Sequence, residues 1–573
     1  MYKENHSHLQ IPLTSHVDEL PENLRKRLKK SWASTFYREF FCRLDEGTFE
    51  VLYANIPSRP NVPVNVLVGL EYLKAGNGWT DEEMYDNFCY DVQVRYALGY
   101  RQLGEGYFDL RTVYYFRERL SRHMQETGMN LLDQAFEQVT DEQLAAFEIK
   151  TGKQRMDSTQ VASNIRQMGR VQLLVEVLQR IYRMLSEADR ARYAEVFLPY
   201  LKGHAGQYVY RMKREEIGSH LQQTGELMQR LLVELKPAYV TEAIYQVLER
   251  VLGDHFQMKG TAVEARPNDD LSATSLQSPD DLEATYREKR GQSYQGYVAN
   301  VTETCDPENK LQLITKVQVA PNATDDGQLL VEALPNLKER NDLKTIFTDG
   351  GHAGPTADTV LQQQGVEQVQ TAIRGRNPNP DKLHLSDFLI RFDEDGKPFE
   401  ATCPQGQTVG LQPSLQKKAF VAHFAAEACA ACSLADKCPA RPGKRDPRHH
   451  LGFTQAEAQV ATRRRRSREH LQEGRNLRAA VEATVRSLKH PFRAGKLPVR
   501  GQFRVACLLI GSAAVANIRR IQRYLEAENE EQNQPESIIC GQSSTPQAAR
   551  DSLLVLFGDI LQRQVSPDWA FSA

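Results

Sequence analysis

The sequence lacks a long uninterrupted hydrophobic run. Its longest apolar stretch, VACLLIGSAAVANI at residues 505–518, contains Gly, Ser and Asn. This stretch is shorter than the roughly 20 residues that a membrane-spanning helix needs. The first residues, MYKENHSHLQ, also lack the basic-then-apolar pattern of a secretion signal. We therefore expect a soluble protein that stays inside the cell.

Cysteine is scarce, with nine residues in a chain of 573, and the number is odd. Small secreted domains that depend on disulfides have more cysteines, usually in even numbers. The composition therefore excludes a disulfide framework and indicates a reducing cytosol. No repeat of fixed period is visible, and the length alone suggests about three or four domains.

The net charge of −2 hides an uneven distribution. Residues 441–523 carry 20 Lys and Arg against five acidic residues, a net charge of +15, so the rest of the chain sums to −17. A solvated charged face usually mixes both signs. A one-sign excess suits a polyanion, and we favour nucleic acid as the partner.

Hydrophobic periodicity divides the chain into helical and mixed parts. Residues 1–150 are predicted to be helical, with a capping box from Thr80 to Glu83, and the pattern is helical again over about 168–256. A helix is also predicted at 326–340. Strand-like runs lie at 153–163, 293–305, 311–321, 343–347 and 365–370. Strands that alternate with helices in this way predict a mixed α/β sheet.

The C-terminal third is predicted to be more irregular. Residues 377–450 read as a loop-rich insert with one short hairpin, and 454–525 read as helical except at 490–501. Residues 526–573 read as an acidic, partly disordered tail.

Asp349 stands in TIFTDGGHAG, where a strand-like run ends and a glycine-rich turn begins. An Asp-Gly turn is the ordinary explanation, because glycine accepts positive φ and aspartate bonds its own backbone. The alternative is a strand that brings a metal-binding carboxylate to the end of a sheet. Asp349 alone does not decide between them.

The segment 475–491, RNLRAAVEATVRSLKHP, predicts an amphipathic helix that ends at Pro491. At 100° per residue four of its charges share a stripe about 60° wide: Arg475, Arg478, Glu482 and Lys489. An i,i+4 pair of Arg478 with Glu482 explains part of this pattern. It does not explain why the other charges are basic.

Three carboxylates surrounded by basic residues suit phosphodiester cleavage with two divalent cations. Magnesium prefers carboxylate oxygens, water and phosphate. The candidates are Asp157 in MDST, Asp349 in FTDGG and Glu482 in VEAT, two on strands and one on a helix. Asp342 is a weaker competitor for the second position.

This order of residues resembles the DDE transposases of bacterial insertion sequences. Their signature reads Tyr-x2-Arg-x3-Glu-x6-Lys, which Arg478, Glu482 and Lys489 match in identity and spacing. The nearest group by resemblance is the eleven-eighty-two type, with a long helical segment after the first Asp and cysteines before the Glu. The signature tyrosine is replaced by Arg475, and an aromatic expected after the second Asp-Gly is replaced by His352.

The resemblance implies an α+β multidomain protein with a ribonuclease-H-like mixed-sheet core at 151–525, a helical N-terminal DNA-binding domain, a large helical insertion and a cysteine-containing insert. It implies Mg²⁺ or Mn²⁺ at Asp157, Asp349 and Glu482. The implied partners are double-stranded DNA, both element ends and target, and a second copy of the chain. A bacterial cytoplasmic, nucleoid-associated location follows. The expected DNA-binding residues are Arg374, Arg376, Arg463, Arg464, Arg465, Arg466, Arg475, Arg478, Lys489, Arg493 and Arg500.

Four cysteines cluster before the glutamate helix: Cys403, Cys429, Cys432 and Cys438. Only Cys429 and Cys432 have the short spacing that zinc sites prefer. The four could form a structural zinc site, with His423 as a substitute ligand, or remain four reduced thiols.

Two other functions stay open from the residues alone. A nuclease on the same core would cut DNA without joining it. A DNA-binding regulator derived from a transposase would keep the basic block, residues 441–523, without catalysis.

Overall fold

The computed structural model describes residues 1–10, 15–54, 59–260, 262–289, 291–371, 379–393, 395–414, 419–443, 446–472 and 477–533. Contacts divide the chain into two units, Met1–Arg523 and Tyr524–Ala573. The described fold of the second unit is the end of one helix, up to Asn533. All sites considered below lie in the first unit.

The N-terminal part is helical, as predicted. Its α-helices are α1 (Glu22–Lys29), α2 (Trp32–Glu39), α3 (Val64–Asn77), α4 (Asp81–Tyr90), α5 (Val92–Ala97), α6 (Leu110–Thr127) and α7 (Leu131–Ala146). The capping box is confirmed: the Glu83 amide donates to Thr80 Oγ1 at 3.1 Å, and Glu83 Oε2 accepts from the Thr80 amide at 2.7 Å.

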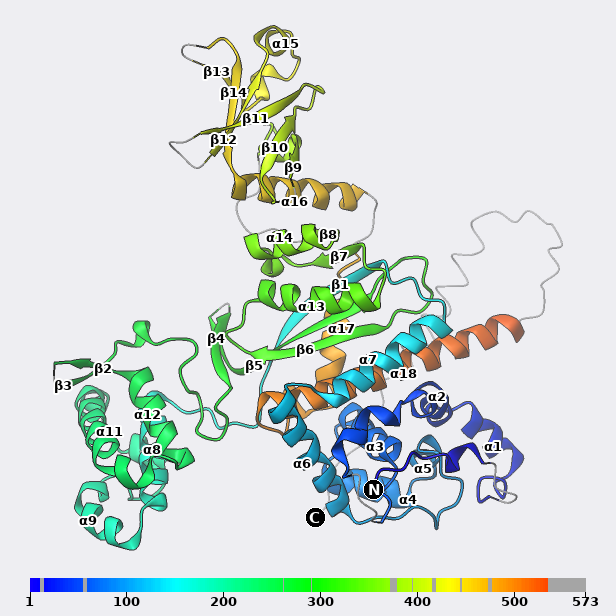
Figure 1. Ribbon diagram of the computed structural model, residues 1–573, viewed down its shortest axis with the longest axis vertical. Coiled ribbons are helices and arrows are strands. Elements are labelled where there is room, and N and C mark those ends of the chain that lie inside the picture. The colour runs from blue at the N-terminus through cyan, green and yellow to red at the C-terminus, as the bar shows by residue number, and fades with distance from the viewer. Residues whose placement is uncertain are drawn as a thin grey trace, which may run out of the picture. The chain divides into compact units, whose positions relative to one another are not determined.

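A mixed sheet forms the centre of the first unit (Figure 1). Its strands are β1 (Lys153–Val161), β4 (Thr285–Lys289), β5 (Gln292–Thr304), β6 (Ile314–Pro321), β7 (Thr345–Thr348) and β8 (Glu367–Gln370). The order is β6-β5-β1-β7-β8, with β4 paired to the start of β5. β5 runs antiparallel to β1 and β6, whereas β7 runs parallel to β1 and β8. The last nine residues of β5 are buried, which is typical of a central strand covered on both faces.

Helices cover this sheet. α13 (Asp326–Arg340) joins β6 to β7, and α14 (Pro355–Gln363) joins β7 to β8. Leu334 and Leu337 of α13 share an apolar core with Met156 of β1 and Ile346 of β7. The sheet strands β1 and β5 also contact α17 (Val481–Lys489), and β6 contacts α7.

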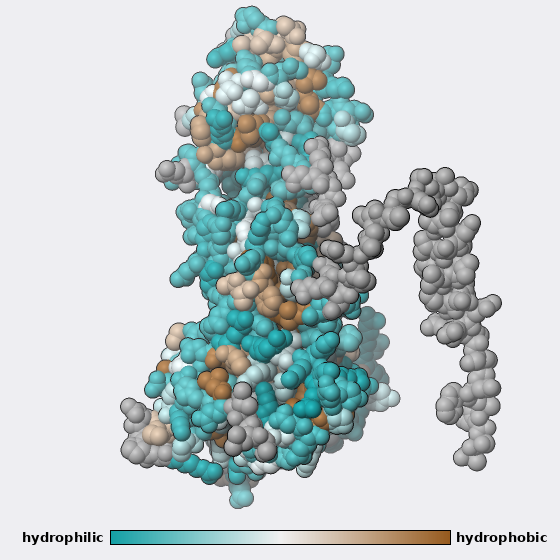
Figure 2. Space-filling model, turned by 90° about the vertical axis from the view of Figure 1, so that its right-hand side faces the viewer, coloured by the Kyte–Doolittle hydropathy of each residue, from teal (hydrophilic) through white to brown (hydrophobic). Residues whose placement is uncertain are grey.

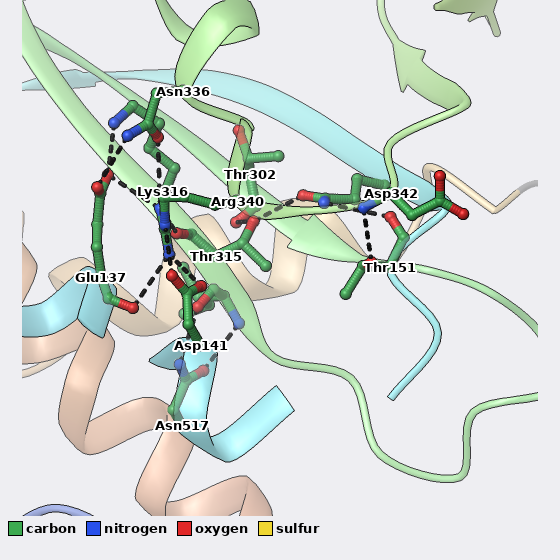
Figure 3. A network of polar contacts seen from close by, with 12 residues as sticks. Glu137, Asp141, Thr151, Thr302, Thr315, Lys316, Asn336, Arg340, Asp342 and Asn517 are labelled. Carbon is green, nitrogen blue, oxygen red and sulfur yellow. Dashed lines mark hydrogen bonds and ion pairs between the residues drawn. The ribbon is translucent and has the colours of Figure 1, made fainter. Parts of the chain in front are cut away.

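A partly buried polar network fixes α7 to the sheet (Figure 3). Lys316 Nζ of β6 lies 2.6 Å from Glu137 Oε1, and Arg340 Nη2 of α13 lies 2.7 Å from Asp141 Oδ1. Asn336 donates to the second oxygen of Glu137 at 2.9 Å. Because each charge is paired and hydrogen-bonded, the cost of burying it is offset. The N-terminal helices are thereby attached to an edge strand of the sheet.

The long helix α18 (Gln502–Asn533) packs against α3. An ideal Cβ on Gly76 would lie 2.4 Å from Val515 Cβ, so only glycine permits this approach.

Part of α18, Gln502–Glu530, is long and apolar enough to cross a membrane, but 67% of its apolar window is buried inside the fold. The helix also extends past residue 525, where we predicted a disordered tail; residues 534–573 lie outside the described part.

The helical insertion predicted at about 168–256 is present. It contains α8 (Arg170–Met184), α9 (Glu187–Phe197), α10 (Ala205–Tyr210), α11 (Ile217–Tyr239) and α12 (Ala243–His255), followed by the hairpin of β2 (Phe256–Lys259) and β3 (Ala262–Ala265). These helices share their own apolar core, which includes Leu178, Leu231 and Leu248.

The prediction of a loop-rich insert at 377–450 is wrong. The described residues form a second six-stranded sheet in the order β13-β14-β12-β11-β10-β9. Its strands are β9 (Leu389–Phe392), β10 (Pro398–Thr402), β11 (Thr408–Ser414), β12 (Ala419–Phe424), β13 (Arg441–Pro442) and β14 (His449–Thr454), with the short helix α15 (Ala426–Ala430). They surround a core that includes Phe388, Phe424 and Phe453. Apolar patches are visible in Figure 2 at the top, where these strands lie in Figure 1.

The reason for the error is physical. These strands have two to seven residues, and β11 and β13 have no fully buried position. Such short strands give only a weak periodic signal. The helices after the insert, by contrast, follow the predicted periodicity: α16 (Gln455–Gln472), α17 and α18, with the predicted irregular segment between α17 and α18.

Candidate functional site

Asp157 and Asp349 lie at the same level of two neighbouring strands. β1 and β7 run parallel, and Arg155 pairs with Phe347. Each aspartate stands two residues beyond its member of that pair, so both side chains lie on the same face of the sheet. Asp157 is 7% exposed, and Asp349 begins the turn after β7.

The electrostatics of the two aspartates differ. Burial raises the pKa of Asp157; Arg478 opposes the rise, and Asp349 adds to it. Burial also acts on Asp349, but its hydrogen bond and charge contact with His352 hold its pKa below the usual range. Asp157 is therefore costly to ionise, whereas Asp349 ionises readily. A cation beside the pair would stabilise the ionised form of both carboxyl groups.

His352 orients Asp349 from a fully buried position. Its Nδ1 lies 2.8 Å from Asp349 Oδ1, and its Nε2 lies 3.4 Å from Asn300 Oδ1. The same Asp349 oxygen accepts from the Gly351 amide at 2.9 Å, so the ordinary Asp-Gly turn is present as well. From the sequence we treated His352 only as a replaced aromatic residue; its spacing of i+3 from Asp349 was the signal for this contact.

Arg478 joins the third candidate to the first. Its Nη2 lies 3.0 Å from Asp157 Oδ1, and its Nη1 lies 3.4 Å from Glu482 Oε1. Glu482 lies in the first turn of α17, and its side chain is 66% exposed. The structure thus brings Asp157, Asp349 and Glu482 to one region, with a guanidinium between Asp157 and Glu482.

Lys489, at the end of α17, reaches the same strand as Asp157. Its Nζ donates to Thr159 Oγ1 at 2.6 Å and to the Gln160 carbonyl at 3.3 Å. Burial lowers the pKa of Lys489. The side chain therefore binds α17 to β1 in this structure.

A buried glutamate that we did not single out from the sequence supports this arrangement. Glu303 of β5 is fully buried, with Arg155 Nε at 2.6 Å and Arg520 Nη1 at 2.7 Å. Thr484 of α17 donates to Glu303 Oε2 at 2.8 Å. Glu303 therefore fixes α17 against β1 and β5; a lone acid within an otherwise uncharged strand was the available signal.

Asp342 lies elsewhere. It precedes β7, so it stands at the opposite end of that strand from Asp349. Its amide donates to Thr151 Oγ1 at 3.2 Å (Figure 3). Its side chain is 70% exposed and pairs with Lys344 at 2.8 Å. Its place at the other end of the strand leaves Asp349 as the stronger candidate.

Much of the predicted DNA-binding charge is engaged with acidic residues of the chain itself. Arg463 pairs with Asp358, and Arg466 Nε lies 3.1 Å from Glu367 Oε1. Arg465 Nε lies 2.8 Å from Glu469 Oε1. Arg464 lines a surface hollow beside the second sheet. Arg374, Arg376 and Arg475 lie outside the described residues.

A cavity of about 920 Å³ lies between the N-terminal helices and the segment after α17. It is lined by Arg493, Lys496 and Arg504, by Trp79 and Tyr114, and by the acidic residues Glu71, Asp81 and Glu118. Arg500 lies nearby in sequence and donates to the Asn164 carbonyl at 2.7 Å. Basic and aromatic side chains together suit contact with a nucleic acid.

The four candidate cysteines come together in the second-sheet insert. Burial raises the pKa of the Cys429 thiol, and Cys438, Cys403 and Cys432 add to the rise. Cys403, Cys429 and Cys438 pack against the same apolar core. Cys403 Sγ accepts from the Gln407 amide at 3.3 Å, and Cys432 Sγ accepts from the Leu434 amide at 3.4 Å.

Comparison with known proteins now adds to this geometry. Residues 402–522 match the family model described as a transposase DDE domain. That match supports a DDE transposase, an enzyme class that acts on DNA. It covers about a fifth of the chain, including Glu482, and begins after Asp157 and Asp349. No curated protein and no solved structure matches the chain.

Proposed function

We propose that this protein is a transposase that cuts DNA at the ends of an insertion sequence and transfers the freed strands to a target. One observation carries the proposal. Asp157 on β1 and Asp349 just after the parallel strand β7 lie at the same level, and Arg478 connects Asp157 to Glu482 on a helix of the segment that matches the transposase DDE domain.

The strand order supports a ribonuclease-H-like core. Three antiparallel strands, β6, β5 and β1, continue into two parallel strands, β7 and β8. Asp157 lies on the central strand β1, and Asp349 follows its parallel neighbour β7. The likeness to the Tyr-Arg-Glu-Lys signature and the eleven-eighty-two type belongs to the same proposal.

The donor set fits divalent metal, which DDE transposase domains generally use. Asp157, Asp349 and Glu482 would hold Mg²⁺ or Mn²⁺, which supplies Lewis-acid activation of the attacking and leaving oxygens. Asp349 is held ready by His352, and Asp157 would exchange its contact with Arg478 for the metal. Arg478 would then be free to hold a backbone phosphate, which positions DNA without reading its sequence.

DNA partners follow from the same proposal. The element ends and the target would lie along the basic residues after α17, with Arg493 and Arg500 in contact with phosphates. A homodimer would bring two ends together, in the bacterial cytoplasm at the nucleoid. Cys403, Cys429, Cys432 and Cys438 would hold a structural Zn²⁺ in the insert.

The test is magnesium-dependent cleavage and strand joining of an element-end duplex by wild type and Glu482→Gln. This substitution keeps the side-chain shape and removes a metal-binding charge. Glu469→Gln, which removes an acid paired with Arg465 on α16, is the matched control. We expect Glu482→Gln to bind the duplex normally and to lose at least 100-fold in cleavage, roughly the size of losing one electrostatic contact in a transition state.

The alternatives give different results. A nuclease would cut the duplex and never join it to target DNA. A regulator would bind it and never cut. Equal cleavage by Glu482→Gln and wild type would show that the glutamate is not part of the site.

A further inference from the structure

Two histidines and an aspartate meet in the second-sheet insert. His423 of β12 and His450 of β14 are direct cross-strand partners, so their side chains lie on the same face of that sheet. Their rings stand edge to face with centroids 4.5 Å apart. Asp446 precedes β14, and its Oδ2 lies 3.4 Å from His450 Nε2 and 3.9 Å from His423 Nδ1. One ligand atom from each residue lies within 4.8 Å of the others.

These ring nitrogens lack the partners that buried polar atoms need. His423 Nδ1 and His450 Nε2 are both buried, and neither has a hydrogen-bond partner within the described part of the chain. Buried polar side-chain atoms are nearly always satisfied, so two unsatisfied nitrogens that face one carboxylate require an explanation. Separations of 3.4 and 3.9 Å are long for hydrogen bonds within the cluster itself.

Arg448 holds the Asp446 carboxylate in place. Its Nε donates to both carboxylate oxygens, at 3.1 and 2.9 Å, and its backbone amide donates to Oδ1 at 3.0 Å. Partners of metal ligands commonly orient them in this way.

Two of the three ligand separations are close to those around a tetrahedral ion. With bonds of about 2.0–2.2 Å to nitrogen and oxygen, neighbouring ligands of tetrahedral zinc stand about 3.3–3.6 Å apart. The two separations from Asp446 need to change by only a few tenths of an ångström. Gly443 contributes to the space, because a Cβ there would lie 2.8 Å from His450 Nε2.

We propose that His423, Asp446 and His450 bind one first-row transition-metal dication, Zn²⁺ above all. The site is separate from the carboxylates of the catalytic proposal and from the four cysteines, and it does not depend on either. Imidazole ligands favour zinc over Mg²⁺ or Ca²⁺, which prefer oxygen. The ion would join β12, β14 and the loop before β14 in an insert with a small core, where a metal adds stability that few buried side chains provide. His423 therefore belongs to this site and is not a substitute ligand for the cysteines.

The experiment uses the full chain, freed of metal with a chelator and then titrated with Zn²⁺ alone. Variants are His450→Gln and the milder Asp446→Asn. His449→Gln is the matched control, because His449 is the next residue of the same strand and therefore points to the opposite face. Bound zinc is counted after dialysis. Substitution of Co²⁺ for Zn²⁺ then shows which type of ligand holds the metal, because thiolate ligands give a near-ultraviolet charge-transfer band that imidazole and carboxylate ligands do not.

We expect His450→Gln and Asp446→Asn to bind one equivalent of zinc fewer than wild type, or to bind it at least 100-fold more weakly, with the thiolate band unchanged. His449→Gln should match wild type. The melting temperature of the zinc-free proteins shows whether the variants fold, and zinc should raise it more in wild type than in His450→Gln. Equal zinc binding by wild type and both ligand variants would overturn the proposal, as would an equal loss in His449→Gln.

Discussion

Replacement of Arg478 by alanine tests whether the positive charge of this arginine stabilises the nearby carboxylates when no metal is bound. Its guanidinium lies 3.0 Å from Asp157 Oδ1, and the two side chains are only 13% and 11% exposed. At an effective dielectric constant of about 20, two unit charges about 4 Å apart interact by roughly 4 kcal/mol. Removal of one partner from a buried pair costs about 3–5 kcal/mol, because the other charge is left uncompensated.

The lower end of that range applies here. Burial already raises the pKa of Asp157, with Arg478 opposing the rise, so without the arginine the carboxyl takes up a proton more readily. We therefore expect a loss of about 3 kcal/mol. A domain of 150–250 residues melts about 2–4 °C lower for each kcal/mol, so the transition of the core should fall by roughly 6–12 °C.

Magnesium should reverse part of this loss. A cation at Asp157 and Asp349 would supply the missing charge, whereas in wild type it must first displace the Arg478 contact, so MgCl₂ should raise the melting temperature of Arg478→Ala more. Thermal unfolding followed by circular dichroism measures both effects. Arg486→Ala, an exposed arginine of α17, is the control. The reasoning is refuted if Arg478→Ala melts like wild type, or if magnesium stabilises the two proteins equally.

Two further predictions concern stability outside the site. His255 is 4% exposed, neither ring nitrogen has a partner among the described residues, and burial, with Arg170 adding, lowers its pKa to about 4. The folded pKa of His255 lies below the unfolded value of about 6.5, so stability is lost as the pH falls from about 6.5 to 4. His255→Phe should remove up to roughly 3 kcal/mol of that loss. The same fall in melting temperature from about pH 6.5 to about pH 4 in wild type and His255→Phe would contradict this. Gly76→Ala should destabilise the protein by about 1–3 kcal/mol in urea unfolding, because its Cβ would meet Val515. Gly253→Ala, a helical glycine with open space around it, should stabilise by up to about 1 kcal/mol, and a similar loss in both variants would show that the contact with Val515 is not the cause.

The elements that carry Asp157, Asp349 and Glu482 could be predicted because each has a local signal. An apolar run before Asp349 gave β7, and the amphipathic period of residues 475–491 gave α17, which begins at Val481 after a turn at 477–480. The contacts between them have no such signal. Arg478 and Asp157 are 321 residues apart in the chain, so only the fold brings them together. The buried Glu303 was missed for the same reason, since its partners come from β1, α17 and α18.

The second sheet shows a different limit of sequence reasoning. Its strands are short, and its core is shared among residues from 388 to 458, so no single segment displays a strong apolar pattern. The two clusters of metal-binding side chains there differ in the same way. The cysteine spacing was visible in the chain, whereas His423 and His450 become neighbours only through the pairing of β12 with β14.

Acidic residues elsewhere in the fold neutralise part of the positive charge of the basic block. Its net charge of +15 in residues 441–523 is matched by a net −17 elsewhere, and several of its arginines pair with those distant acids. Arg463 meets Asp358 and Arg466 meets Glu367, so their charges hold α16 against the helix and strand that follow β7. Charge that is neutralised within the fold cannot also release counterions from DNA. The salt dependence of DNA binding should therefore correspond to fewer phosphate contacts than the block has arginines, with most of them contributed by the segment after α17, where Arg493 and Arg504 line the cavity of about 920 Å³.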